Sequence, residues 1–322
     1  MQYFRRHCCS IFGSENSSGE GGIKTEGIKS ILFKKFETKS VLRLSRLKEF
    51  LFLLLHYKVS CIGLFIVISI IFLAIFAPII APKHYAETDV PNKLQPPSLA
   101  HPFGTDALGR DIFSRVVYGA QIALWVGFVV VLVEALIGVS LGIIAGYFNG
   151  KIDKLISAIT DIVWSFPTVV LALGVVMVLG PGITQVVVAI AVTSWPGFTR
   201  ITRAKVQSMV NREFVLAARS IGESDLNIML RYLLPNIMST ILVLATLTLP
   251  SAIISTTALS FLGFGAQPPT PDWGAMLSEG ASQLVVAPWV ATFPGIFIVI
   301  TALGFNLLGD GLRDLLDPKL KV

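Results

Sequence analysis

The chain has 322 residues, of which 53% are hydrophobic and 14% are charged, with a formal net charge of +6. Soluble domains usually carry about 25% charged residues, so the composition excludes an ordinary soluble protein and indicates a polytopic membrane protein. A basic balance is also typical of nucleic-acid-binding proteins, but the sequence shows neither the basic helix nor the aromatic–basic patch that such proteins use.

Residues 1–58 are predicted to form a cytoplasmic N-terminal extension ahead of a six-span domain at 59–322. Ser14–Gly22 is rich in Ser, Gly and Glu, which is typical of flexible segments. Lys34–Lys48 mixes basic and apolar residues, which favours a topogenic charge cluster over a basic amphipathic helix on an anionic membrane. Because Met1–Gly13 lacks the apolar core of a signal peptide, we expect the first span to remain as an uncleaved anchor.

Six apolar stretches approach the ~20 residues that a helix needs to cross a bilayer core. The predicted spans are about 59–81, 118–145, 155–179, 183–201, 237–262 and 288–308. The third contains Pro167, and the fourth is interrupted near Trp195-Pro196-Gly197. The predicted fold class is therefore an all-α membrane protein with six transmembrane helices.

Positive residues are distributed unequally between the segments that join these spans. Twenty-two Lys or Arg residues precede the first span or fall in 146–154, 199–235 and 309–322, whereas four fall in 83–118 and none in 259–288. Lys and Arg accumulate in cytoplasmic loops, so both termini and 199–235 are expected in the cytoplasm. His101–Arg115 and Gln267–Trp273 are then expected outside, as parts of a multi-pass protein of the inner or plasma membrane.

The second predicted span contains a carboxylate, Glu134, among apolar residues. A carboxylate at this depth is costly, and it usually marks a functional site. Glu134 is a candidate to line a water-filled pathway or to pair across a subunit interface, and the alternative is a protonated side chain hydrogen-bonded within the helix bundle.

Glycines recur at every fourth position of the same span, at Gly138, Gly142 and Gly146. This spacing lets helices pack backbone to backbone, so we predict a helix contact here. The stretch also contains a G-x-S-x-G pattern around Ser140, but a serine hydrolase needs that pattern on a strand-to-helix turn.

No catalytic, cofactor or metal site is predicted, and the chain is not expected to be an enzyme. The sequence contains three cysteines, Cys8, Cys9 and Cys61. Their spacing fits neither a metal site nor a disulfide framework. Gly150-Lys151 is not part of a phosphate-binding loop, because Ala145 and Ile152 stand where Gly and Ser or Thr are required. The chain therefore has no ATP-binding loop at this position, and energy must come from a partner or from a gradient.

Residues 212–236 form a mostly polar segment between the fourth and fifth spans. Its apolar positions at helical spacing are Phe214, Ala217, Ala218 and Ile221. They predict a short helix with one nearly flat face, where the two Ala residues let another protein approach closely. Gly222 is expected to end this helix in the left-handed conformation, and Ser224 or Asp225 to cap a second helix.

This segment resembles the EAA motif of ABC-importer permeases, which is Glu-Ala-Ala, three residues, Gly, nine residues and Ile-x-Leu-Pro. The matching residues are Ala217, Ala218, Gly222, Leu234 and Pro235. Leu216 and Tyr232 stand where the motif has Glu and Ile, and Glu213, one turn earlier, is the candidate replacement for that Glu. The resemblance implies a coupling helix that inserts into a cleft on a separate ATPase subunit. The alternative is a loop that only connects two spans.

Four further blocks closely resemble the dipeptide/oligopeptide/nickel permease group, specifically its C-type second subunit. They are His101–Arg115, which is similar to "HPLGTDxLGRD", Asp161–Pro167, Ser260–Gly274 and Phe305–Arg313. The resemblance implies the type I ABC-importer permease fold and import of di- or oligopeptides, or of a related solute such as nickel. It also implies three kinds of partner: a homologous permease subunit, two ATPase subunits and an extracytoplasmic solute-binding protein. Within the first block, Asp106–Arg110 and Asp111–Arg115 are expected to pair at i, i+4 along a short helix.

A gradient-driven secondary transporter is the rival function. Such a transporter needs ionisable groups within the membrane as coupling sites, and Glu134 is the one clear candidate in the sequence. A membrane enzyme is less favoured, because the sequence shows no His, Cys or paired-carboxylate constellation in its spans.

Overall fold

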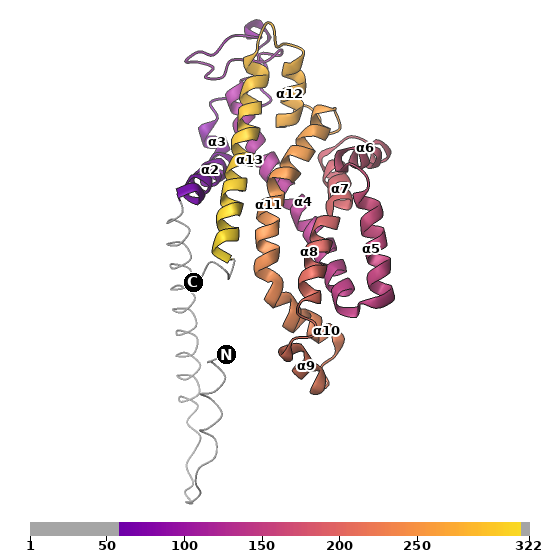
Figure 1. Ribbon diagram of the computed structural model, residues 1–322. Coiled ribbons are helices and arrows are strands. Elements are labelled where there is room, and N and C mark those ends of the chain that lie inside the picture. Colours follow the sequence, from indigo (N-terminus) through magenta and orange to yellow (C-terminus); the bar gives the residue numbers. More distant parts are fainter. Residues whose placement is uncertain (1–57, 317–322) are drawn as a thin grey trace, which may run out of the picture. The chain divides into compact units, whose positions relative to one another are not determined.

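The computed structural model describes residues 58–316, and within that range it contains helices but no strands. The predicted N-terminal extension and its basic segment lie outside the described residues. In chain order the elements are α2 (Lys58–Ile75), α3 (Ala77–Ile80), the 3-10 helix η1 (Val90–Asn92), α4 (Ile112–Phe148), α5 (Gly150–Trp164), α6 (Thr168–Leu179), α7 (Ile183–Ser194), α8 (Pro196–Gln207), α9 (Glu213–Ser220), α10 (Asp225–Asn227), the π-helix η2 (Ile228–Leu233), α11 (Leu234–Phe261), α12 (Trp273–Ala281) and α13 (Trp289–Leu316) (Figure 1).

Three helical runs of the described part are long and apolar enough to cross a membrane by length and composition: α4, the run Asp225–Phe261 that ends in α11, and α13. A fourth candidate is the pair α5 and α6, which is bent by 88° at the break between the two helices. Pro167 stands at this break, and a proline both lacks the N–H for a helical bond and disfavours helical backbone in the preceding residue. The predicted third span is therefore two helices at nearly a right angle.

The remaining two predicted spans correspond to shorter helices. The first is covered by α2, whose apolar part Val59–Ile75 is followed by the short α3. The fourth is divided into α7 and α8, which meet at Trp195 and Pro196, and α8 continues past the predicted boundary to Gln207. Helices thus end within three of the six predicted spans, at Phe76, Pro167 and Trp195.

A ladder of three glycines, Gly138, Gly142 and Gly146, brings α4 and α8 into close contact. A Cβ atom added to Gly138 would lie 2.6 Å from the Trp195 carbonyl oxygen, and one added to Gly142 would lie 2.6 Å from Thr202 Cβ. Both distances are shorter than real side-chain contacts, so α8 can approach α4 this closely only over glycine. The prediction that these glycines pack helices is confirmed, and the stretch is helical throughout rather than a catalytic turn.

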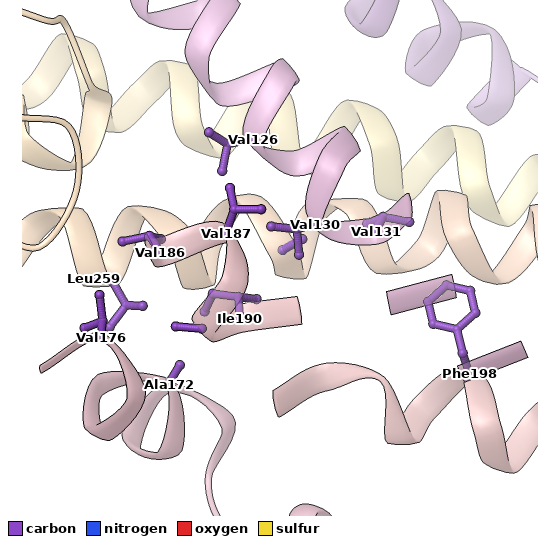
Figure 2. Close-up of a cluster of buried hydrophobic side chains, with 12 residues drawn as sticks. Val126, Val130, Val131, Ala172, Val176, Val186, Val187, Ile190, Phe198 and Leu259 are labelled. Atoms are coloured by element: carbon purple, nitrogen blue, oxygen red, sulfur yellow. The ribbon is translucent and has the colours of Figure 1, made fainter. Parts of the chain in front are cut away.

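The broken helices are held against the long ones by a hydrophobic cluster, which Figure 2 shows in close-up. Its buried members include Val126, Val130 and Val131 of α4, Ala172 and Val176 of α6, Val186, Val187 and Ile190 of α7, Phe198 of α8 and Leu259 of α11. Because five helices contribute to this cluster, α6 and α7 have fixed positions beside α4 and α11 despite their short length. At the two ends of this helical unit lie α9 and α10 on one side and α12 on the other (Figure 1).

Candidate functional site

The helix α9 forms the first half of the predicted helix–turn–helix, and its end is closed by the local sequence. Gly222 has a φ angle of +82°, which is the left-handed conformation predicted for it. The Gly222 N–H donates to the Arg219 carbonyl at 3.0 Å, and the Glu223 N–H donates to the Ala218 carbonyl at 3.1 Å. These two bonds form a Schellman motif, which satisfies carbonyls that the helix end would otherwise leave unpaired.

Ser224 caps the second helix, and Asp225 has a different partner. The Ser224 hydroxyl accepts a hydrogen bond from the Asn227 N–H at 3.4 Å. The Asp225 carboxylate instead accepts from the Tyr147 hydroxyl at 2.5 Å, and the Arg219 guanidinium lies 5.0 Å from the centroid of the same Tyr147 ring. Tyr147, near the C-terminal end of α4, therefore contacts both halves of the helix–turn–helix.

The two faces of α9 differ sharply in exposure. Val215 is 0% exposed and Ala218 is 3% exposed, and both belong to a buried cluster with residues of α4, α8 and η2. The opposite face is exposed, and we call it the outer α9 face; it consists of Glu213, Leu216, Ala217, Ser220 and Ile221. The prediction that Ala217 and Ala218 share one open face is wrong for Ala218, which packs in the buried cluster. Successive residues of a helix point about 100° apart, so Ala217 stays exposed when Ala218 is buried.

Glu213 lies on the same exposed face as Leu216, the residue at the position of the missing motif Glu. The two positions are three residues apart, so their side chains are neighbours on the helix surface. The structure therefore places a carboxylate next to the site where the motif has one, although one turn earlier in the chain.

Leu234 and Pro235 begin α11 directly after the π-helix η2. A proline has no N–H to donate to the carbonyl four residues earlier, so a regular α-helix would lack one hydrogen bond at Pro235. The wider π-helix lies directly before this position. Leu233 is the fully buried residue of this junction, at 0% exposure, whereas Pro235 is exposed. These residues set how the chain enters α11 and belong to the same end of the helical unit as α9 (Figure 1).

Glu134 is 1% exposed on α4, about 20 Å from its C-terminal end at the usual helical rise. Ser194, the last residue of α7, lines the same pocket as the carboxyl group. The second carboxyl oxygen, Oε2, has no hydrogen-bond partner among the described residues. The helix bundle therefore buries Glu134 while leaving Oε2 without a partner among the described residues.

Glu134 lines a pocket of about 200 Å³, which we call the Glu134 pocket. The other lining residues are Trp164, Thr168, Ile190, Thr193, Ser194, Pro196, Gly197, Thr248, Ser251, Ala252 and Ser255. Six of these carry hydroxyl groups, and they come from α6, α7 and α11. Sequence reasoning identified the carboxylate but not these partners, which stand up to about 120 positions away in the chain.

The opposite end of the helical unit carries an ionic cluster that joins His101–Arg115 to α12. The Arg115 guanidinium contacts Asp106 Oδ2 at 2.5 Å and Glu279 Oε2 at 2.7 Å, and Arg110 contacts the same two carboxylates at 2.6 and 3.0 Å. The predicted Asp106–Arg110 pair is present, but in a loop. The predicted Asp111–Arg115 pair is wrong.

Asp111 is used in another way, because it stands at the N-terminal cap of α4. Its carboxylate accepts from the Ser114 N–H at 2.8 Å, and its other oxygen lies 2.9 Å from His101 Nδ1. Capping therefore outcompetes an ion pair along the helix, and Arg115 is free to reach Glu279 on α12.

Comparison with known families gives two matches along the chain. Residues 138–322 match the family described as binding-protein-dependent transport system inner membrane component. Residues 45–97 match the N-terminal TM domain of oligopeptide transport permease C. Together the two matches include the predicted first span, the EAA-like segment and the last span.

Two curated relatives show similarity over most of the chain. One is the dipeptide transport system permease protein DppC of Alkalihalophilus pseudofirmus, which is 48% identical over 264 residues, or 82% of this chain and 87% of that protein. Another is the glutathione transport system permease protein GsiD of Escherichia coli, which is 51% identical over 258 residues, or 79% of this chain and 84% of that protein.

A chain of the solved MetNI methionine ABC transporter, in an inward facing conformation, has a similar fold. The TM-score is 0.50 at 19% sequence identity, and the match covers 62% of this chain and 96% of that chain. At this identity the likeness concerns the fold alone, and it agrees with the all-α permease fold expected from the sequence.

Proposed function

Because the chain belongs to the family of binding-protein-dependent transport system inner membrane components, we propose that it is the C-type permease subunit of an ATP-driven importer of dipeptides or oligopeptides. The observation that carries the proposal is the 48% identity to a dipeptide permease over 82% of the chain. A glutathione permease at 51% identity supports the same solute class, because glutathione is itself a small peptide. Nickel, the other solute implied by the resemblance, gains no support from these relatives.

The outer α9 face is the docking surface for an ATPase subunit in this proposal. Its exposed apolar residues, Leu216 at 47% and Ile221 at 75%, have no partner surface within the described residues and suit burial against another protein. Glu213 supplies the one carboxylate of that face, in place of the motif's Glu. Ala218 packs α9 against the buried cluster, and Gly222 ends the helix. Leu234 and Pro235 fix the connection to α11.

Three partners follow from membership in such a transport system. A homologous permease completes the pathway, two ATPase subunits hydrolyse ATP because this chain carries no nucleotide-binding loop in its sequence, and a binding protein delivers the solute from outside. Both termini and 212–235 lie in the cytoplasm, with His101–Arg115 and Gln267–Trp273 outside. The positions of α9 and α12 at opposite ends of the helical unit support placing them on opposite sides of the membrane (Figure 1), and the charge distribution decides which side is the cytoplasm.

Uptake by the reconstituted transporter tests the proposal. Proteoliposomes would contain this chain with its partner permease and ATPases, and the binding protein with radiolabelled dialanine would be added outside. We expect uptake that requires internal ATP, stops with ADP and persists when ionophores collapse ion gradients. Uptake that needs a proton gradient and ignores ATP would instead establish the rival secondary transporter, for which the family comparisons give no support.

A further inference from the structure

The junction between α5 and α6 and the junction between α7 and α8 both lie at the Glu134 pocket. Trp164 ends α5 and Thr168 begins α6, while Ser194 ends α7 and Pro196 begins α8, and all four residues line the pocket. Non-helical backbone at membrane depth is tolerated only inside protein or beside a water-filled cavity, and such helix breaks often border transport sites. The break between α5 and α6, where the backbone of Pro167 is not helical and the two helices bend by 88°, therefore indicates a built site, whereas Trp195 between α7 and α8 keeps helical dihedral angles.

Three of the six hydroxyl groups of the pocket offer acceptors rather than donors. Thr193 donates its hydroxyl proton to the Ala189 carbonyl at 2.9 Å, and Thr248 donates to the Leu244 carbonyl at 2.8 Å. Ser251 donates to the Thr248 carbonyl at 2.7 Å. Each proton is already used within its own helix, so the oxygen presents its lone pairs to the surroundings.

The charge of the pocket has one sign. Glu134 is the single ionisable residue in the lining, and no Lys, Arg or His side chain of residues 58–316 forms an ion pair with it. Arg200, which lies 4.0 Å from the centroid of the Trp164 ring, pairs with Asp161 at 2.6 Å instead. The free Oε2 atom of Glu134 therefore lacks a cationic partner within the described part of the chain.

We infer that the Glu134 pocket binds the ammonium group of the peptide amino terminus during transport. This inference rests on the proposed function and adds to it the part of the substrate that this subunit recognises. An ammonium group has three donors and no acceptor, which complements one carboxylate surrounded by hydroxyl oxygens.

A metal ion fits this pocket less well than an ammonium group. Transition metals prefer imidazole and thiolate ligands, and no group of three or more His, Cys, Asp or Glu residues that could hold a metal occurs in the described part of the chain. The same donor-only requirement favours peptides with a free amino terminus over acylated ones. Ile190, a member of the hydrophobic cluster in Figure 2, also lines the pocket and offers an apolar contact for a side chain beside the amine.

Equilibrium binding of radiolabelled dialanine to the transporter without its binding protein tests this inference. The complex of both permeases and the ATPases would be held in nanodiscs. We expect Glu134→Gln to weaken dialanine binding by at least about tenfold, as befits a lost charge-assisted hydrogen bond. Glu134→Asp should keep part of the affinity, and Glu87→Gln, which changes an exposed carboxylate in the predicted outer loop, should change nothing.

Competition identifies the recognised group. N-acetyl-dialanine should displace the label poorly from the wild-type complex, whereas ethylammonium should displace it at high concentration and Ni²⁺ should not. Three outcomes would each overturn the inference. They are equal dialanine affinity of the wild type and Glu134→Gln, strong competition by N-acetyl-dialanine, and no saturable binding to the wild type below roughly 10 mM dialanine. ATP-dependent uptake by the same complex in proteoliposomes, with the binding protein added outside, separates this failure from failure of the proposed function, because uptake would continue if only the pocket assignment is wrong.

Discussion

Ala217 and Ala218 are neighbours in the chain but have different surroundings, which gives two matched substitutions. Ala218→Asp would place a carboxylate without a partner in the buried cluster around Val215. It should destabilise the packing of α9 against this cluster by about 2–4 kcal/mol. Ala217→Asp changes an exposed position and should leave the fold intact. Limited proteolysis of 208–230 in the purified permease pair should therefore speed up for Ala218→Asp alone.

Ala217→Asp should show its effect in the assembled complex, as weaker binding of the ATPases and lower ATPase stimulation by the loaded binding protein. Unchanged ATPase binding in both variants would exclude the outer α9 face as the docking surface.

Gly222 permits a second test at the same site, because its requirement is conformational and not steric. A Cβ atom added there meets nothing within 4 Å, yet φ is +82°. Gly222→Val should cost about 1–3 kcal/mol of local strain, since a β-branched residue rarely adopts this conformation. Gly222→Asn is the matched control, because Asn accepts the left-handed region at little cost.

The measurement for Gly222 is ATP hydrolysis stimulated by the loaded binding protein in the reconstituted complex. We expect Gly222→Val to lose most of the stimulation and Gly222→Asn to keep it, with normal membrane insertion of both. Equal stimulation in the two variants would mean that the turn does not transmit the signal.

Among the helices, the contact between α4 and α8 has the clearest steric basis. Gly142→Ala would bring a methyl group within 2.6 Å of Thr202 Cβ, and we expect a loss of about 1–3 kcal/mol through overpacking. Gly174→Ala is the same change in α6 at a position where nothing lies within 4 Å, so it should be neutral or stabilise by up to about 1 kcal/mol. Thermal unfolding of the purified complex should separate the two variants, and a common change in Tm would contradict the packing assigned to the glycine ladder.

Local features of the helices were predictable from sequence, whereas their partners were not. The left-handed Gly222, the Ser224 cap and the glycine spacing depend on residues within one or two turns. The 88° bend at Pro167 depends on how α6 packs in the hydrophobic cluster of Figure 2, so the proline alone did not give the angle. Arg115 was misassigned for the same reason, because its partner Glu279 stands more than 160 positions away.

For the whole molecule, the family and the all-α fold were predictable because four sequence blocks and the apolar spans occur in one order. The Glu134 pocket was only half predictable. A carboxylate within an apolar stretch is visible in sequence, but the surrounding hydroxyls are ordinary Ser and Thr residues until α6, α7 and α11 bring them together. Periodicity also cannot show which end of a helical unit faces the cytoplasm, so the orientation depends on the charge distribution alone.

Side-specific labelling tests the orientation of the whole chain directly. In a cysteine-free background, a single cysteine at Ser224, which is exposed beside α9, should react with a membrane-impermeant maleimide only in inverted vesicles. A cysteine at Gln267, which is exposed before α12, should react only in right-side-out vesicles, and Val285, which is 99% exposed after α12, serves as its matched control. The reason is that 199–235 carries six of the positive residues whereas 259–288 carries none. If the cysteines at Ser224 and Gln267 react from the same side, the six-span arrangement is contradicted. If each reacts from the side opposite to the one expected, the orientation is inverted, and α9 would lie where no ATPase could reach it.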